Sequence, residues 1–286
     1  MKTPSGQSSP RKPSWLKVPP PYARHSHRIR ATLTELRLHT VCQEAACPNI
    51  AECFESGTAT FLIMGNICTR NCLYCNVRQG NPTSVDEEEM ARLVSAAQEM
   101  NLKYVVITSV TRDDLPDGGS GFFAACIDRL RRELPQIKIE ALIPDFQGSV
   151  VALDKVISAA PAVINHNMEI VDPLYARLRP QGNYLISLNI LRNISRSYIV
   201  SKSGFMLGFG EKRDDILRLL DDLASVDCAR LTIGQYQQPT RNHWPVVKYY
   251  HPDEFAELKE IAYQKGFQHV ESGPLVRSSY HAACEV

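Results

Sequence analysis

The sequence predicts an α/β fold, a partial (β/α) barrel of about six strand–helix units with an N-terminal extension and a C-terminal tail. Three observations predict it. Short apolar runs alternate with helical patterns from about Ser84 onward, the connections between them are short, and six of the nine cysteines precede this alternation. Repeated strand–helix units build parallel sheets that close, or partly close, into barrels. We expect the extension over residues 1–57, the barrel over residues 58–272 and the tail over residues 273–286.

The alternation begins with a helix and a strand. Ser84 and Glu87 stand at capping-box spacing, which predicts a helix that starts near them and runs to about Met100. Its apolar face is formed by Met90, Leu93, Val94 and Ala97. Residues 104–110 are largely β-branched and predict a strand, and the loop 111–120 that follows is rich in Asp and Gly. A polar loop at a strand end is where barrels carry their chemistry.

The same alternation continues toward the C-terminus. The next predicted helix buries a face made of Phe123, Cys126, Ile127, Leu130 and Leu134, so Cys126 is expected to be a small core residue. Further strands are expected over residues 137–143, 162–166, 205–209 and 230–234. Helices are expected between them, including residues 214–224 and 252–265, the second of which is stopped by Gly266.

Charge and hydropathy limit the partners and the location. Lys and Arg number 32 against 31 Asp and Glu, so no overall field attracts nucleic acid or an anionic membrane. No stretch approaches the roughly 18 apolar residues of a membrane span. We therefore expect a cytoplasmic protein with no nucleic-acid partner and no membrane partner. The basic stretch 24–30 is interpreted as a solvated arm.

The clustered cysteines form two sets with different spacings. Cys42, Cys47 and Cys53 are spaced C-x4-C-x5-C, whereas Cys68, Cys72 and Cys75 are spaced C-x3-C-x2-C. Structural zinc sites usually pair two C-x2-C arms or add histidines, and neither set fits that pattern. Three thiolates can instead hold three corners of a cubane iron–sulfur cluster and leave the fourth iron open. Two triplets therefore predict two 4Fe-4S clusters.

The second set resembles the signature of the radical S-adenosylmethionine superfamily. Its sequence from Cys68 to Cys75 is C-T-R-N-C-L-Y-C, with an aromatic residue directly before the last cysteine. The resemblance implies that the open iron chelates the amino and carboxylate groups of S-adenosylmethionine. It also implies reductive cleavage to a 5′-deoxyadenosyl radical, which the protein must orient and shield from water.

Within that superfamily the chain resembles the lipoyl synthase family. The upstream triplet is joined near the C-terminus by an R-S-S-Y motif, Arg277 to Tyr280. The resemblance implies that the tail closes on the extension, where Ser279 becomes the fourth ligand of an auxiliary cluster held by Cys42, Cys47 and Cys53. Its implied catalytic residues are Cys68, Cys72, Cys75 and Ser279. An alkoxide is a harder ligand than a thiolate and should leave iron more readily when the cluster gives up its sulfur.

The same resemblance implies the reaction and the partners. The reaction is a sulfurtransferase reaction that places two sulfur atoms at C6 and C8 of a protein-bound octanoyl group. The implied substrates are octanoylated lipoyl carrier domains, namely 2-oxoacid dehydrogenase E2 subunits and the glycine cleavage H protein. Electrons would come from reduced ferredoxin or flavodoxin, and an iron–sulfur carrier would repair the auxiliary cluster.

Polar residues at two predicted strand ends are candidates for binding S-adenosylmethionine. Both family resemblance and barrel logic point to these positions. An ordinary Asp/Gly turn, or strand-end side chains bonded to neighbouring loops, explains any one of them about as well. The candidates are Thr108, Ser109, Asp113 and Asp114 at the end of one strand and in the loop after it, and Asn165 and His166 at the end of another.

Two other functions share some of these motifs. A methylthiotransferase also carries two clusters, but that family adds an RNA- or protein-binding domain for which 286 residues leave no room. A non-catalytic electron-transfer or metal-binding module would need neither a barrel of this length nor the R-S-S-Y tail. Both alternatives therefore explain fewer of the motifs.

Overall fold

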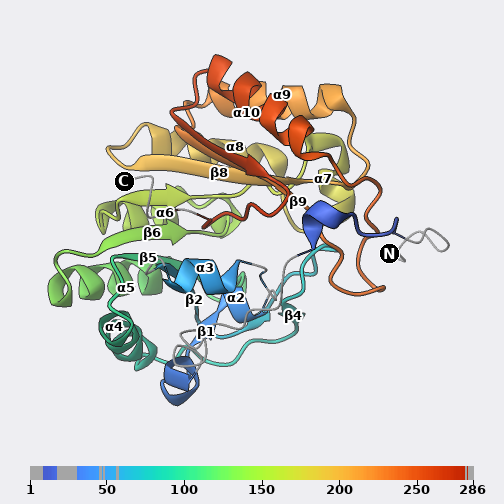
Figure 1. Cartoon of the computed structure of the whole chain (residues 1–286). Coiled ribbons are helices and arrows are strands. Elements are labelled where there is room, and N and C mark those ends of the chain that lie inside the picture. Colours follow the sequence, from blue (N-terminus) through green and yellow to red (C-terminus); the bar gives the residue numbers. More distant parts are fainter. Residues whose placement is uncertain are drawn as a thin grey trace.

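The computed structural model describes residues 9–17, 31–44, 47, 49–55, 58–280 and 282. Its centre is an eight-stranded sheet in the order β1-β2-β5-β6-β7-β8-β9-β10, and a separate pair is formed by β3 and β4. Helices cover the outer side of this sheet (Figure 1). The basic stretch 24–30 and Cys284 lie outside the described residues.

The elements alternate along the chain as the sequence predicts. The strands are β1 (His39–Thr40), β2 (Thr58–Ile63), β3 (Ile67–Cys68), β4 (Arg78–Gln79), β5 (Tyr104–Ser109), β6 (Lys138–Leu142), β7 (Val163–Asn165), β8 (Val200–Leu207), β9 (Arg230–Gln235) and β10 (His269–Gly273). The helices are η1 (Ser14–Leu16), α2 (Val41–Glu44), α3 (Ile50–Glu55), α4 (Glu89–Glu99), α5 (Ser120–Glu133), η2 (Phe146–Gly148), α6 (Val150–Ser158), α7 (Asp172–Leu178), α8 (Tyr184–Ser195), α9 (Arg213–Ser225) and α10 (Pro252–Gln264). No helix among these is long and apolar enough to span a bilayer.

The large sheet is a partial barrel, which confirms the predicted fold class. β1 pairs with β2 in antiparallel fashion, and every other neighbouring pair is parallel. Across the described residues the ladder runs from β1 to β10 and does not join those two ends. Seven strands are parallel, one more than the predicted number of about six units.

Polar inward-facing residues explain the strand boundaries that the sequence did not predict. β10, H-V-E-S-G, holds a single large apolar residue, so it gives no strand signal. β8 begins at Val200, five residues before the predicted strand, because its first part holds buried polar residues: Lys202 faces Glu140 in the interior, and the Ser203 hydroxyl donates to His166 O. The sequence Thr58–Ile63 is buried throughout and forms β2, which lies directly between the two cysteine sets.

The predicted helices hold, but the predicted capping box of the first is wrong. α4 begins at Glu89, and the Asp86 side chain accepts the Glu88 N–H at 3.0 Å in place of a Ser84 cap. The start is shifted because Glu89 is buried and its carboxylate accepts the Met64 N–H at 2.7 Å. The helix therefore begins where this carboxylate can reach the end of β2.

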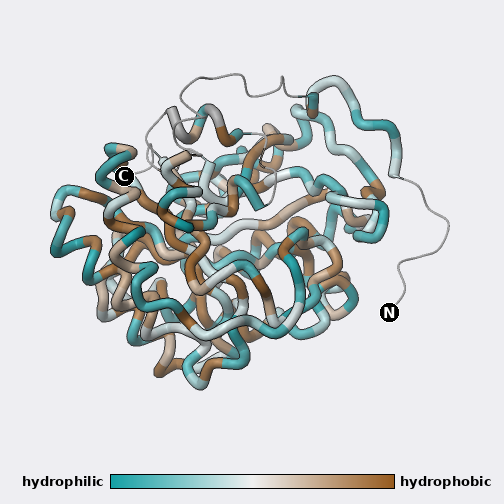
Figure 2. The backbone as a smooth tube through the Cα atoms, turned by 90° about the horizontal axis from the view of Figure 1, so that it is seen from below, coloured by the Kyte–Doolittle hydropathy of each residue, from teal (hydrophilic) through white to brown (hydrophobic). Residues whose placement is uncertain are grey.

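The hydrophobic core lies between the strands and the outer helices. The outward side chains of β5, Val105 and Ile107, are fully buried in one cluster with Phe123 and Ile127 of α5. Cys126 is buried beside them, as predicted. Hydrophobic and hydrophilic residues alternate along the outer helices, the pattern of amphipathic helices packed on a sheet (Figure 2).

The inner face of the barrel carries a buried polar group instead. Glu140 of β6 and Lys202 of β8 are fully buried with their charged atoms 3.3 Å apart. The same carboxylate accepts hydrogen bonds from the Tyr104 hydroxyl at 2.9 Å and from the Asn165 amide at 3.0 Å. Three parallel strands therefore converge on one carboxylate from β6.

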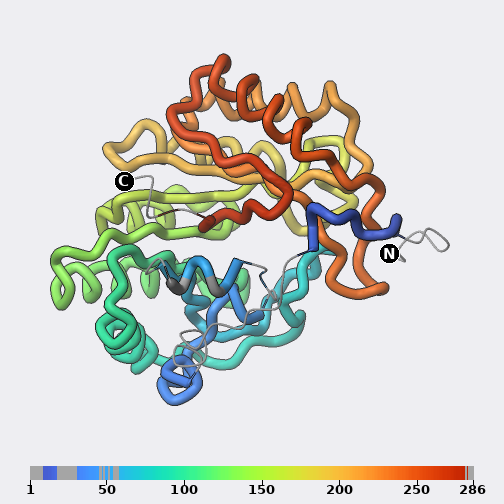
Figure 3. The backbone as a smooth tube through the Cα atoms, viewed as in Figure 1, coloured from blue at the N-terminus to red at the C-terminus, as the bar shows by residue number. Residues whose placement is uncertain are grey.

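Both ends of the described chain pack on the barrel. Residues 9–17 lie beside the segment that follows β9 (Figure 3). Ser9 Oγ donates to Gln238 at 2.6 Å, and Lys12 Nζ donates to Gln237 at 2.8 Å. At the other end, Gly234 leaves room for the tail, because a Cβ atom there would lie 2.3 Å from the carbonyl oxygen of Val276.

Replacing the buried carboxylate should destabilise the barrel strongly. We expect Glu140→Ala to lower the free energy of unfolding by about 3–5 kcal/mol, because it leaves a buried ammonium without this counter-charge. Glu257→Ala, which breaks an exposed pair with Arg213 on the outer surface, should have little effect. Urea unfolding followed by circular dichroism measures both, and equal losses would contradict the prediction.

Candidate active site

The second cysteine set lies at the carboxyl end of the barrel strands. Its loop leaves β2 and is bracketed by the short strands β3 and β4, with the Gly80 N–H donating to Cys68 O at 3.0 Å. Two backbone hydrogen bonds hold its centre, because the Leu73 N–H donates to Leu178 O and Leu73 O accepts from Trp244, each at 2.9 Å. The loop is therefore fastened over the strand ends, where such barrels carry chemistry.

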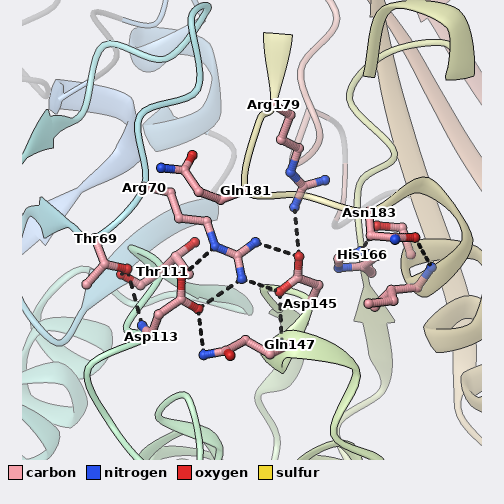
Figure 4. A network of polar contacts seen from close by, with 12 residues as sticks. Thr69, Arg70, Thr111, Asp113, Asp145, Gln147, His166, Arg179, Gln181 and Asn183 are labelled. Carbon is pink, nitrogen blue, oxygen red and sulfur yellow. Dashed lines mark hydrogen bonds and ion pairs between the residues drawn. The ribbon is translucent and has the colours of Figure 1, made fainter. Parts of the chain in front are cut away.

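A buried guanidinium inside the loop ties it to two neighbouring strands. Arg70 donates to Asp113 at 2.7 and 2.9 Å and to Asp145 at 2.5 and 2.7 Å (Figure 4). Burial alone would raise the pKa of Asp145, but the hydrogen bonds from Arg70 outweigh it and lower that pKa. Thr69 adds a bond to Thr111 O at 2.9 Å. Fork-like pairing of this kind fixes orientation as well as distance.

Cys68, Cys72 and Cys75 line one cavity of about 180 Å³, which we call the first cavity. Three of the residues predicted to bind S-adenosylmethionine, Thr108, Ser109 and His166, line it too. The Ser109 hydroxyl is buried there and, within the described part of the chain, has no hydrogen-bond partner. A buried polar atom in this position favours a ligand that supplies the missing bond.

The structure places the other predicted binding residues outside the cavity lining. Asp113 is paired with Arg70, and Asp114 is paired with Arg112 at 2.8 Å. Asn165 ends β7 with its side chain turned into the barrel toward Glu140. Their roles in cofactor binding therefore remain predictions, and their visible roles are to hold the loop and the barrel interior.

His166 is fixed as a neutral side chain. Burial lowers its pKa to about 4. Its Nδ1 lies 3.0 Å from Ile143 O, and its Nε2 lies 3.0 Å from the hydroxyl of Ser187. A neutral imidazole adds no charge to the cavity beside the thiols.

Glu169 and Arg179 also line the first cavity, and sequence reasoning missed both. Burial raises the pKa of Glu169, and the nearby charge of Arg179 opposes that rise. Arg179 donates to the Tyr175 hydroxyl at 2.6 Å and lies 3.9 Å from Asp145. Each stands in a loop after a strand or helix, and only the tertiary fold brings them to the cysteines.

The first cysteine set lines a second cavity, of about 140 Å³. The elements that bound it are far apart in sequence: α2, α3, β2, β6 and the C-terminal tail. It is lined by Val41, Cys42, Cys47, Asn49, Cys53, Thr58, Thr60, Leu142 and the four residues from Arg277 to Tyr280. The predicted ligand Ser279 is thus brought to the three cysteines from more than two hundred residues away.

Three of the four R-S-S-Y residues have side-chain anchors on different elements. Arg277 donates to Gln235 O on β9 at 3.3 Å, and the Tyr280 hydroxyl lies 3.2 Å from the Glu52 carboxylate on α3. Ser278 accepts from the Asn167 amide at 2.7 Å. These contacts hold the turn around Ser279 against the second cavity.

The two cavities adjoin. Leu142, at the carboxyl end of β6, lines both of them. Asn167 lines the first cavity and reaches Ser278 in the lining of the second. Leu142 and the Asn167–Ser278 hydrogen bond therefore connect the linings of the two cavities.

Cys42 is buried and the other five cysteines of the two sets are partly buried, which bears on what their thiols can bind. Burial raises the pKa of Cys42 to about 11, and of Cys53 and Cys75 to about 12. The neighbouring cysteines of the same set contribute to these raised pKa values. Buried, closely grouped thiols become thiolates when a cation binds, and thiolates are the ligands that iron–sulfur clusters prefer. The residues present therefore fit such a cluster in each cavity.

Two further features of the described residues bear on this assignment. No group of three or more His, Cys, Asp or Glu side chains is placed to hold a single metal ion there. A larger cavity, of about 690 Å³, lies at the opposite end of β5 and β6, beside Tyr104 and Lys138. None of the predicted site residues lines it.

Comparison with known proteins assigns the family. The model of the radical SAM superfamily matches residues 62–223, and that of the N-terminal domain of lipoyl synthase matches residues 1–47. The lipoyl synthase of Caldanaerobacter subterraneus subsp. tengcongensis is 50% identical over 274 residues, which cover 95% of this chain and 96% of the relative. The chain belongs to the lipoyl synthase family. The lipoyl synthase of Aquifex aeolicus is 51% identical over 90% of this chain and 94% of the relative.

Solved structures share the fold. Methylornithine synthase (PylB) matches with a TM-score of 0.55 and 14% identity, over 87% of this chain and 82% of that one. HydG, a maturase of the FeFe hydrogenase, matches with a TM-score of 0.54 and 14% identity, over 91% of this chain and 73% of that one. At these identities the likeness concerns the fold, and it agrees with the partial barrel.

Membership in the lipoyl synthase family confirms the predicted activity. The chain is a radical S-adenosylmethionine enzyme, a sulfurtransferase that inserts two sulfur atoms at C6 and C8 of a protein-bound octanoyl group. The superfamily implies a 4Fe-4S cluster and S-adenosylmethionine, and the family implies octanoylated carrier proteins as substrates.

Removing the guanidinium of Arg70 should release the cysteine loop. Arg70→Ala removes the ion-pair partner of Asp113 and leaves the buried Asp145 with only the more distant Arg179, at 3.9 Å, and breaking such a buried pair costs about 3–5 kcal/mol. We expect less iron per chain after anaerobic reconstitution and slower cleavage of S-adenosylmethionine. Arg129→Ala, which breaks a partly exposed pair with Glu133 on α5, is the control. Unchanged iron content in Arg70→Ala would contradict this role.

Proposed function

We propose that this lipoyl synthase holds two 4Fe-4S clusters in the two adjoining cavities. Cys68, Cys72 and Cys75 would bind the cluster that works with S-adenosylmethionine in the first cavity. Cys42, Cys47, Cys53 and Ser279 would bind the auxiliary cluster in the second. The observation that carries the proposal is that each triplet lines its own cavity and that Leu142 lines both.

When bound, the first cluster supplies the electron that cleaves S-adenosylmethionine to a 5′-deoxyadenosyl radical, and the auxiliary cluster supplies the sulfur. The protein residues bind and orient the reactants, and they exclude water from the site. The lining of the first cavity offers hydroxyls from Thr108 and Ser109, the carboxylate of Glu169 and the guanidinium of Arg179. These groups suit a ligand that carries an ammonium, a carboxylate and ribose hydroxyls at once.

Ser279 of the tail is suited to be a cluster ligand that must later dissociate from iron. The cavity offers three thiols and the hydroxyl of Ser279, whose turn is anchored by its neighbours on both sides. An oxygen ligand binds iron less tightly than the softer thiolates. We therefore assign Ser279, and not Ser278, to the auxiliary cluster, because Ser278 already accepts from Asn167.

The octanoyl chain would lie against the side chain shared by the two cavities. An alkyl chain needs apolar walls, and Leu142 supplies one at the point where the cavities meet. Carbons on either side of this residue are then close to both cysteine sets. This arrangement supports hydrogen abstraction and sulfur insertion without relocation of the substrate.

The proposal extends to partners and organisation. We infer that the carriers are 2-oxoacid dehydrogenase E2 subunits and the glycine cleavage H protein. Reduced ferredoxin or flavodoxin would supply electrons, and an iron–sulfur carrier would rebuild the auxiliary cluster. We also propose a cytoplasmic location and the division at residues 57 and 272, between which the barrel strands β2 to β9 lie.

Variants of the two triplets should separate the two roles. Cys68→Ala, Cys72→Ala or Cys75→Ala should abolish formation of 5′-deoxyadenosine, because S-adenosylmethionine then lacks its cluster. Cys42→Ala, Cys47→Ala or Cys53→Ala should still form 5′-deoxyadenosine but insert no sulfur. Each set should keep about four of the roughly eight iron atoms that two clusters contain.

The measurements are 5′-deoxyadenosine, iron content and the mass of an octanoylated carrier peptide, all under the same reducing conditions. Cys126→Ala, a core cysteine outside both cavities, is the control for loss of a buried thiol. Sulfur-containing peptide from a Cys42, Cys47 or Cys53 variant would refute the sulfur-donor role. 5′-Deoxyadenosine from a Cys68, Cys72 or Cys75 variant would refute the other assignment.

The two serines of the tail should differ. Ser279→Ala should weaken the auxiliary cluster and lower the yield of lipoyl product, because it removes the fourth ligand. Ser278→Ala should be milder, because it removes one hydrogen bond of about 1 kcal/mol. Absorption spectra of the reconstituted variants and product mass measure both effects. Equal, near-normal spectra and yields would sink the ligand assignment.

A further inference from the structure

Asn167 stands between the two cavities and contacts both. It follows β7 by two residues, and its side chain lines the first cavity. Its Nδ2 donates to the Glu169 carboxylate at 3.0 Å and to the Ser278 hydroxyl at 2.7 Å. The carboxylate fixes the amide orientation, because the amide nitrogen is the donor that a carboxylate accepts. One amide group therefore joins the lining of the first cavity to the R-S-S-Y turn of the second.

The position of Asn167 is set from the first-cavity side. Its backbone oxygen accepts from Arg179 at 3.4 Å, and both Arg179 and Glu169 line that cavity. The side chain also packs over β8, because a Cβ atom at Gly204 would lie 3.0 Å from Asn167 Oδ1. Oδ1 itself is buried and, among the described residues, lacks a hydrogen-bond partner. A ligand in the first cavity would therefore contact Glu169 and Arg179, the two residues that hold Asn167 in position.

The hydrogen bond between Asn167 and Ser278 differs from the other two anchors of the tail, because it links the tail to a residue that lines the first cavity. Arg277 is hydrogen-bonded to Gln235 on β9, and Tyr280 is hydrogen-bonded to Glu52 on α3. Neither Gln235 nor Glu52 lines the first cavity. Of the three described anchors, Ser278 is the one whose partner, Asn167, lines the first cavity. Ser278 directly precedes Ser279 in the chain, so its bond governs where Ser279 is presented.

We propose that Asn167 is a positioning residue that couples occupancy of the first cavity to order in the tail at the second. S-adenosylmethionine in the first cavity fixes Glu169 and Asn167, and Asn167 then holds Ser278 and presents Ser279 to the auxiliary site. Because such linkage is reciprocal, a well-held tail also favours the ligand in the first cavity. This inference rests on the proposed function, which places S-adenosylmethionine in the first cavity and Ser279 at the auxiliary site.

Hydrogen exchange of the tail tests the coupling. The full-length, reconstituted enzyme is compared with and without S-adenosylmethionine, in the absence of reductant so that no turnover occurs. In the unmodified enzyme the cofactor should slow exchange of peptides that contain residues 276–280 by about threefold to tenfold, the effect of one hydrogen bond. Ser278→Ala should abolish this cofactor-dependent slowing at saturating S-adenosylmethionine, and by the reciprocal linkage its affinity for the cofactor, measured by equilibrium dialysis, should fall by no more than about threefold to tenfold.

Two further variants make the test specific. Asn167→Ala combined with Ser278→Ala should lose no more tail protection than Ser278→Ala alone, because both act through one bond. Ser225→Ala, which removes a hydroxyl from the exposed end of α9, should keep the full cofactor effect. Undiminished slowing in Ser278→Ala, additive losses in the double variant, or no cofactor effect in the unmodified enzyme would each overturn the proposal.

The outcome can be separated from the ligand assignment of Ser279. If Ser279→Ala leaves the auxiliary-cluster spectrum intact while the cofactor still slows tail exchange through Ser278, the ligand assignment fails and the coupling stands. If Ser279→Ala disrupts that cluster and tail exchange ignores the cofactor, the ligand assignment stands and the coupling fails.

Discussion

The buried contact of Arg70 with Asp113 and Asp145 is the constraint on which the site depends. The cysteine loop is framed by β3 and β4, each only two residues long, so backbone pairing alone holds little of it. Arg70 compensates by joining the loop to the segments that follow β5 and β6. A buried guanidinium is tolerated only when its donors are satisfied, so the loop has essentially one position in which this happens. The lining of the first cavity follows from that position.

A second constraint comes from inside the barrel. Its outer face packs on helices with apolar side chains, whereas Glu140, Lys202 and Tyr104 meet on the inner face. These groups satisfy one another's hydrogen-bonding capacity in the barrel interior. Ala282 of the tail packs against Tyr104. The polar floor keeps the strands in register while the carboxyl ends of those strands remain available for chemistry.

The sequence predicted the features that depend on the spacing of residues close together in the chain. The spacing of two cysteine triplets and the R-S-S-Y motif pointed to the correct family, and helical periodicity placed α5, α9 and α10 within a few residues. It failed where tertiary structure decides. β10 has too few apolar residues to be recognised, Asp113 binds Arg70 instead of lining the cavity, and Asn165 turns into the barrel because side chains alternate along β7. Glu169 and Arg179 lie in loops with no local pattern.

With a cluster in each of the adjoining cavities, as proposed, one barrel could serve two successive sulfur insertions. β6 lies between β5 and β7 in the sheet, and its last residue, Leu142, faces both cysteine sets. The extension and the tail come from opposite ends of the chain, yet they meet on one side of this residue, while the C-x3-C-x2-C loop occupies the other. A flexible alkyl chain held against Leu142 would lose most of its freedom once, on binding, and would need only a small shift between C6 and C8. Proximity of this kind favours sequential reactions at fixed groups over release and rebinding of the substrate.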